Sequence, residues 1–375
     1  MPGRRFSLLF ILALAESSAL AVKANLKVGI VRPKTGPMAP IGEELHNGVM
    51  LAYKKLQNSK QPNASQRIKI IDEDDAGMSS TATKAAETLI NRHRVHLLIG
   101  SVSNTLNHAI ADVASRKNKL LILPIGTDSD ILAKGTNIFS VSLSEAQQGA
   151  ALGKFASTFL KKTKALIMEE VDNPYSKILS KNFISQFKKS GGLSAEVVKF
   201  GSEGDTEEST LSQAAKVEQE VTFYPGFYNE AKKFIMAFKE KKINSVFIGG
   251  DGWDTFQIRD IFGADFSGHY YYTPYSANDP HPAMQRFIRS FELEYKKPPS
   301  LAAFAGYEAF NLAVFAYQKV KSNRTSPLQS FLSTTRKLPS LTGQMKMSPT
   351  RNAIKPATIM VTTPQGSRFM TRITP

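Results

Sequence analysis

The strongest candidate for a chemical role in this sequence is Asp251. Residues 247–256 read FIGGDGWDTF, so an apolar run ends in two glycines, and a carboxylate and the only tryptophan of the chain, Trp253, follow. A carboxylate behind a buried strand could act on a substrate, hold a cationic ligand or cap the next element. From these residues alone, all three alternatives stay open.

Two further loops place polar groups behind apolar runs. Ser103 and Asn104 follow LLIG and precede a helical pattern, and Thr127 follows LILPIG. The first amides of a helix favour an anion, so helix capping and carboxylate binding are compatible interpretations of Ser103 and Asn104. Thr127 could contact a ligand or only begin a helix.

Other polar clusters do not form a metal or catalytic motif. Residues 72–75, DEDD, lack the ligand spacing of a calcium loop, and His93 and His96 have no third ligand nearby. The chain has no cysteine, Gly-x-Ser-x-Gly elbow, phosphate-binding loop or dinucleotide fingerprint. Glu169 and Glu170 have no identifiable partner acid. We therefore expect no metal, no cofactor and no enzymatic activity.

Alternating strands and helices would position these loops. Apolar runs without alternation precede amphipathic segments, which predicts α/β structure with mostly parallel sheets. The pattern starts again near residue 163, which predicts two lobes with a cleft at the carboxyl ends of the strands. The predicted strands are 25–31, 66–77, 95–101, 119–126, 163–170, 193–200, 217–226, 244–251 and 268–276, with helices between them and at 281–297 and 301–320.

Charge and composition restrict the partners. The 375 residues carry a formal net charge of +16, but the lysines occur as scattered pairs at helical positions among apolar residues. No basic run contains interleaved aromatics, so we interpret the lysines as solvated helix faces and expect no nucleic-acid partner.

The first 24 residues resemble a secretory signal peptide. Arg4 and Arg5 precede a short apolar stretch, and small residues follow, with cleavage expected after Ala21 or Ala24. No cysteine is available to carry a lipid, so we expect a free protein in the periplasm.

The order of the loops resembles the periplasmic substrate-binding proteins of the branched-chain amino-acid (Leu/Ile/Val) family. The motifs run from about Lys27 to Gly366 and include VGIVRPKTGPMAPIG, IDEDDAG, LLIGSVSN, LILPIGTDSDILAKG, FSVSLSEAQQGAALGKF, VDNPYSKIL, FYPGFYNEAKKF, FIGGDGWDT and LTGQMKMS. This resemblance implies a type I periplasmic-binding fold, with two Rossmann-like lobes joined by a hinge of three crossings.

The same resemblance implies a site. Ser103 and Asn104 would hold a ligand carboxylate, with Ile125 and Thr127 as a second contact. On the other lobe, Asp251 would meet an amino group. Tyr175 and Phe227 would supply aromatic contacts. Donors at one end and a carboxylate at the other suit a zwitterion in a dry cleft.

Four positions depart from the family pattern. Ile41 replaces an aromatic residue, Asn104 replaces a serine, Phe227 stands where a tyrosine is frequent, and Trp253 adds bulk beside the acid. The general amino-acid clamp is partly kept while the specificity pocket is changed. The sequence therefore does not identify the ligand.

The resemblance also implies the organisation and the partners. We expect a signal peptide at 1–24, a first lobe of 25–143 and 274–342, and a second lobe of 144–273 and 343–375. The implied function is to close around an amino acid or related carboxylate and deliver it to an ABC-type permease, as a monomer. Presentation of the closed form to a membrane receptor is an alternative, and an exported α/β enzyme is disfavoured by the missing catalytic motifs.

Overall fold

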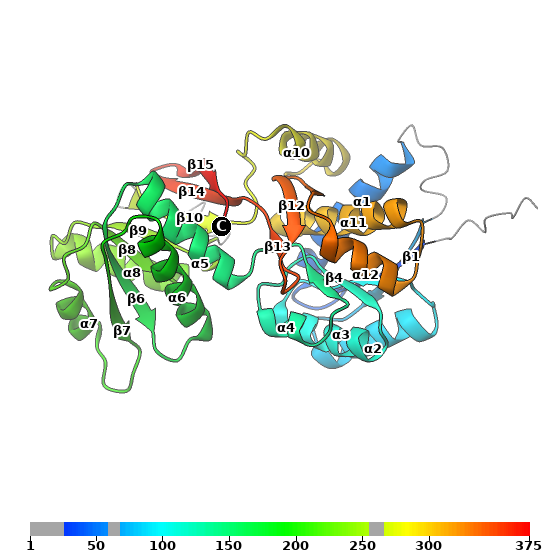
Figure 1. Cartoon of the computed structure of the whole chain (residues 1–375), viewed down its shortest axis with the longest axis horizontal. Coiled ribbons are helices and arrows are strands. Elements are labelled where there is room, and N and C mark those ends of the chain that lie inside the picture. Colours follow the sequence, from blue (N-terminus) through cyan, green and yellow to red (C-terminus); the bar gives the residue numbers. More distant parts are fainter. Residues whose placement is uncertain (1–25, 59–67, 255–265) are drawn as a thin grey trace, which may run out of the picture.

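The computed structural model describes residues 26–58, 68–254 and 266–375, which form two α/β lobes side by side (Figure 1). Both large sheets are mostly parallel. The predicted fold class is therefore confirmed. The proposed signal peptide at 1–24 lies outside the described residues.

The first lobe is built on a five-stranded parallel sheet of order β2-β1-β3-β4-β5. Strands β3 and β4 are completely buried, as expected for short apolar runs covered on both faces. The strands are β1 (Leu26–Arg32), β2 (Ile68–Asp74), β3 (Leu97–Ile99), β4 (Leu120–Leu123) and β5 (Ile138–Ser140), and the helices between them are α1 (Ala39–Gln57), α2 (Ser79–Asn91), α3 (Asn104–Arg116) and α4 (Ser129–Ala133).

The second lobe has a seven-stranded sheet of order β15-β14-β10-β9-β8-β6-β7, in which only β14 and β15 are antiparallel to their neighbours. Separate apolar clusters fill its two faces, one with α5 and α6 and the other with α7 and α8. Its strands are β6 (Lys164–Glu170), β7 (Ser194–Phe200), β8 (Val221–Tyr224), β9 (Val246–Gly249), β10 (Tyr270–Thr273), β14 (Ala357–Thr363) and β15 (Gly366–Ile373). The helices are α5 (Glu145–Lys154), the π-helical turn η2 (Phe155–Phe159), α6 (Pro174–Lys189), α7 (Glu207–Ala214) and α8 (Tyr228–Glu240).

After β10 the chain returns to the first lobe. Helices α10 (Pro282–Tyr295), α11 (Leu301–Val320) and α12 (Thr325–Thr334) are followed by the small sheet β11 (Leu338–Ser340), β12 (Gly343–Met347) and β13 (Ala353–Ile354). Helix α11 lies so close to α1 that a Cβ on Gly48 would stand 1.9 Å from the carbonyl oxygen of Ala303. Glycine is therefore required at this helix crossing, which fixes the start of α11 beside the cleft.

The chain crosses between the lobes for the third time at a different position from the one predicted from the sequence. The boundary at 343 is wrong, because Met345, Met347 and Ala353 belong to the first lobe's core, whereas Ala357 belongs to the second. The chain therefore crosses at Lys355 and Pro356. An apolar strand carries no local signal of which lobe its side chains will join, so the sequence pattern could not place this boundary.

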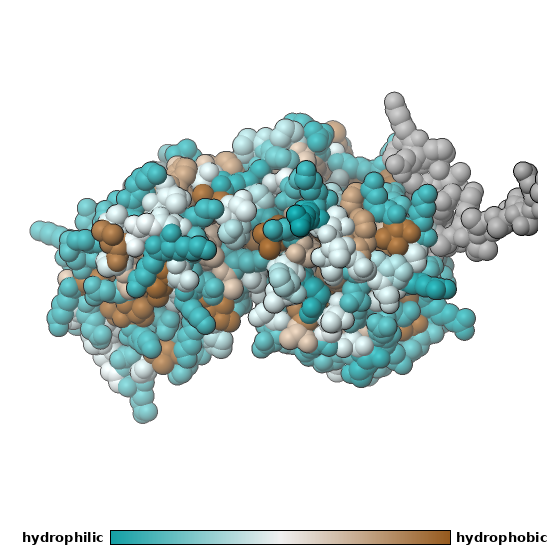
Figure 2. Space-filling model, viewed as in Figure 1, coloured by the Kyte–Doolittle hydropathy of each residue, from teal (hydrophilic) through white to brown (hydrophobic). Residues whose placement is uncertain are grey.

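The face of the molecule shown in Figure 2 is mostly hydrophilic. On this face, apolar residues form separate small patches on both lobes, and the outline is indented where the lobes meet. Within the described ranges, no helix is both long and apolar enough to cross a membrane.

Candidate functional site

Asp251 follows β9 and opens the short 3-10 turn η3 (Asp251–Trp253). The two preceding glycines make room for aromatic groups, since a Cβ on Gly249 would stand 2.1 Å from the Trp253 ring and one on Gly250 would stand 2.4 Å from the Tyr175 hydroxyl. Trp253 is 1% exposed and belongs to the second lobe's core. The glycines therefore allow the strand end to seat between two aromatic residues, with the carboxylate next to Tyr175.

Two neutral side chains hold the Asp251 carboxylate. The Tyr175 hydroxyl donates to Oδ1 at 2.6 Å, and the Gln148 amide donates to Oδ2 at 3.0 Å. The same hydroxyl accepts a hydrogen bond from the Gly252 amide at 3.2 Å. The turn's own amides at Asp251 and Gly252 also donate to this carboxylate. Turn capping and ligand binding are therefore compatible interpretations of Asp251.

The electrostatics of this carboxylate are unusual. Burial raises the pKa of Asp251 above its ordinary value, while the hydrogen bonds from Tyr175 and Gln148 act in the opposite direction. Burial and the neighbouring Asp251 charge raise the pKa of Tyr175, so the phenol stays a donor. Among the described side chains, none forms an ion pair with Asp251. A cationic group from a ligand would supply the missing counter-charge.

Asp251 faces a cavity shared by the two lobes. Ile125 and Thr127, from the loop after β4, line the same cavity, so the structure brings three of the predicted residues together. The full lining is Pro124, Ile125, Thr127, Val141, Ser142, Asp251, Asp254, Pro274, Leu301, Phe304, Ala305 and Lys355. The wall is therefore mainly apolar, with carboxylates from the second lobe and an ammonium group from the third passage.

Tyr175 and Phe227 lie together on the second lobe. Their rings stack with centroids 6.0 Å apart and planes 19° apart. Phe227 immediately precedes α8 and is 57% exposed, whereas Tyr175 is turned towards Asp251. Phe227 thus forms an exposed apolar surface beside the carboxylate.

Ser103 and Asn104 lie outside the walls of this cavity. Ser103 is the N-cap of α3, and its hydroxyl oxygen accepts a hydrogen bond from the Leu106 amide at 3.4 Å. Asn104 is the first residue of that helix. The capping interpretation of Ser103 is confirmed, and its contact with a ligand stays a prediction.

Several polar residues near the site were not predicted. Gln148, on α5, is fully buried and holds Asp251, and Lys355 is a buried cation in the cavity wall. Burial and the Asp251 charge raise the pKa of Glu145 to about 7, although a Thr127 hydrogen bond opposes this. The motif FSVSLSEAQQGAALGKF contains both Glu145 and Gln148, so their position at the start of α5 was the available signal.

Over residues 26–58, 68–254 and 266–375, no three acidic, histidine or cysteine side chains are grouped so that they could hold a metal ion.

Two α/β lobes, three chain passages between them and a shared cavity define a two-lobed solute-binding protein. The chain belongs to the periplasmic binding protein family, whose model matches residues 25–367. This finding confirms the family resemblance.

Relatives and solved structures agree with this assignment. The Leu/Ile/Val-binding protein of Rhizobium johnstonii is 24% identical over 299 residues, covering 79% of this chain and 78% of that protein. A branched-chain amino acid transporter substrate-binding protein of Streptococcus pneumoniae, solved with isoleucine, has a TM-score of 0.69 and 20% identity, covering 92% of this chain and 99% of that one. A solute-binding protein of an ABC transporter from R. palustris, solved with benzoate, has a TM-score of 0.66 and 22% identity, covering 94% and 97%.

Proposed function

We propose that the protein binds an amino acid or a related small carboxylate between its lobes and delivers it to an ABC-type permease, without catalysing a reaction. The observation that carries this proposal is the Asp251 carboxylate, which among the described side chains meets only neutral donors, at a cavity shared by both lobes. Relatives named for leucine, isoleucine and valine support an amino-acid ligand, and the benzoate complex supports a wider set of carboxylates.

In this proposal Asp251 binds the amino group of the ligand. Tyr175 and Gln148 keep the carboxylate ionised and oriented, and the stacked Tyr175 and Phe227 rings cover it from the side of the second lobe. The loop at Ile125 and Thr127 and the first amides of α3, at Ser103 and Asn104, face the ligand's carboxylate as the lobes close.

Closure would use the three passages near residues 141–143, 273–275 and 355–356. A ligand that contacts both lobes at once favours the closed state by its differential affinity for that state. We further propose that the mature protein acts as a monomer in the periplasm. The family description and the basic, apolar and small-residue pattern of residues 1–24 support this location. On the face shown in Figure 2, the small size of the separate apolar patches supports the monomer.

Calorimetric titration of purified protein tests the proposal. The protein is unfolded and refolded to remove carried-over ligand, then titrated with aliphatic, aromatic, polar and acidic amino acids and with aromatic carboxylates. We expect saturable one-to-one binding of an amino acid, and a loss of about 2–5 kcal/mol of binding free energy in Asp251→Asn. The matched control is Asp172→Asn, an exposed acid three positions before Tyr175.

The outcomes separate the parts of the proposal. Equal affinity of Asp251→Asn for the amino acid would remove Asp251 from the site. Binding only of acids without an amino group would keep a carboxylate-binding function and end the role of Asp251 as an ammonium partner. Conversion of a bound compound to a product would contradict a purely binding role.

A further inference from the structure

Lys355 is a buried cation at the third passage between the lobes. It stands between β13 of the first lobe and β14 of the second, and it is 3% exposed. Its side chain lines the same cavity as Thr127 and Asp251. A lysine is seldom buried without an acceptor, because removing an ammonium group from water is costly.

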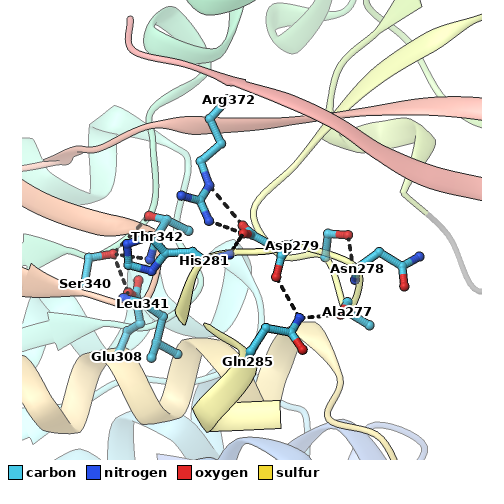
Figure 3. Close-up of polar contacts among 11 residues, drawn as sticks. Ala277, Asn278, Asp279, His281, Gln285, Glu308, Ser340, Leu341, Thr342 and Arg372 are labelled. Atoms are coloured by element: carbon cyan, nitrogen blue, oxygen red, sulfur yellow. Dashed lines mark hydrogen bonds and ion pairs between the residues drawn. The ribbon is translucent and has the colours of Figure 1, made fainter. Parts of the chain in front are cut away.

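Part of that cost is met by Glu308, on α11. The Lys355 ammonium donates to Oε2 of Glu308, and the Glu308 residue is itself only 3% exposed. The other carboxylate oxygen accepts hydrogen bonds from the Ser340 hydroxyl at 2.5 Å and the Leu341 amide at 2.7 Å (Figure 3). Glu308 is therefore held in place by the end of β11 and the residue after it, and these two neutral donors disperse its charge.

After pairing with Glu308, the Lys355 ammonium group still has N–H donors to offer. A lysine has three N–H donors, and within the described part of the chain the only hydrogen bond from the Lys355 ammonium is to Glu308. The nitrogen lies 5.0 Å from the centre of the Phe304 ring, another residue of the cavity wall. The remaining N–H groups are thus available to an acceptor inside the cavity.

The cavity is polarised by these groups. Asp251 and Asp254 contribute carboxylates from the second lobe, and Lys355 contributes the ammonium group. The wall between them is apolar, with Ile125 and Leu301 among its residues. A ligand with an amino group and an acidic group would match both ends, because charge-assisted hydrogen bonds are stronger in such an apolar site.

We infer that Lys355 binds the carboxylate of the ligand and selects carboxylic acids over their amides. This inference rests on the proposed function, because it places a contact for the same ligand. It adds to the loop donors a charged anchor that the sequence pattern did not indicate. A purely structural Lys355–Glu308 pair is the alternative, and it would affect acids and amides equally.

The test compares the affinities for acids and for their amides in a variant that leaves no buried charge unpaired. Lys355→Met alone would leave Glu308 buried and unpaired, so the double variant Lys355→Met/Glu308→Gln is used. Isoleucine with isoleucinamide and benzoate with benzamide are titrated into the wild-type and variant proteins. Lys346→Met, which removes an exposed lysine of β12, is the matched control. Circular dichroism establishes that each variant is folded.

We expect the wild-type preference for the acid over its amide to fall roughly thirty-fold or more in the double variant, and to be unchanged in Lys346→Met. An acid-to-amide ratio that is the same in the double variant and the wild type would overturn the inference while leaving the proposed function intact. If the wild type binds no amino acid and no aromatic carboxylate of the calorimetric panel, both the proposed ligand class and this inference fail.

Discussion

Arg372, in the last strand of the second lobe, forms a two-pronged ion pair with Asp279, in the loop that has just returned to the first lobe (Figure 3). The Nε of Arg372 donates to Oδ2 at 3.0 Å, and a terminal nitrogen donates to Oδ1. Asp279 is completely buried and also accepts from the His281 amide at 2.9 Å. The pair therefore joins the lobes beside the second passage, where it restricts their relative movement.

Breaking this pair should destabilise the protein. We expect Arg372→Met to lower the free energy of unfolding by about 3 kcal/mol, because it leaves a buried carboxylate without its cation. Urea denaturation measures the loss, and Arg368→Met, an exposed position of the same strand, is the control. Equal stability of both variants would show that the pair does not join the lobes in solution.

Removing the Tyr175 hydroxyl should raise the pH at which the protein binds its ligand tightly. That hydroxyl lowers the pKa of Asp251, so Tyr175→Phe raises it further and leaves less carboxylate at neutral pH. We expect roughly tenfold weaker amino-acid binding at pH 7, with recovery as the pH rises. Affinities measured between pH 6 and 9 test this, with Tyr53→Phe on the first lobe as control. A pH-independent loss would show that the hydroxyl contacts the ligand rather than tuning Asp251.

Glu145 should make stability fall as the pH rises towards 7. Its pKa is raised to about 7 from 4.5, mainly by burial, so the folded state holds the proton more tightly than the unfolded state does. The protein therefore loses stability between about pH 4.5 and 7, and the penalty is complete above 7.

The variant Glu145→Gln removes this penalty. We expect it to be more stable than the wild type by about 1 kcal/mol at pH 8 and similar at pH 4.5, a modest value because the carboxyl is only partly buried. Denaturation midpoints at the two pH values measure this, with exposed Glu196→Gln as control. Parallel pH profiles of Glu145→Gln and the wild type would contradict the assignment.

The hydroxyl of Ser103 should matter for stability more than for affinity. It caps α3, so Ser103→Ala should cost about 1 kcal/mol of unfolding free energy, while Ser103→Asn should keep most of it. We expect ligand affinity to change less than about threefold, because the hydroxyl lies outside the cavity wall and the α3 amides remain. A tenfold loss of affinity in both variants would instead make Ser103 a direct ligand contact.

The part of the site that could be predicted lies next to strand ends. Thr127 and Asp251 each follow an apolar run, and the carboxyl ends of parallel strands meet at one edge, so their position was implied by local pattern. The resemblance to a known family added Ile125, which lines the same cavity, and Tyr175 and Phe227, which pack against each other.

The contacts that set the chemistry could not be predicted in this way. Gln148 and Tyr175 reach Asp251 across 103 and 76 positions of the chain, and Lys355 meets Glu308 across 47. No sequence periodicity indicates such pairs, because they depend on how helices α5, α6 and α11 pack against their sheets.

The sequence by itself determined the two α/β lobes and the loops at their strand ends, because strand and helix formation follow from local apolar periodicity. Only the tertiary structure decided that residues 343–354 join the first lobe, that Asp251 meets neutral donors, and that a lysine is buried at the third passage. These features arise from packing between segments far apart in the chain, where burial and the distance between charged groups are set by the whole fold.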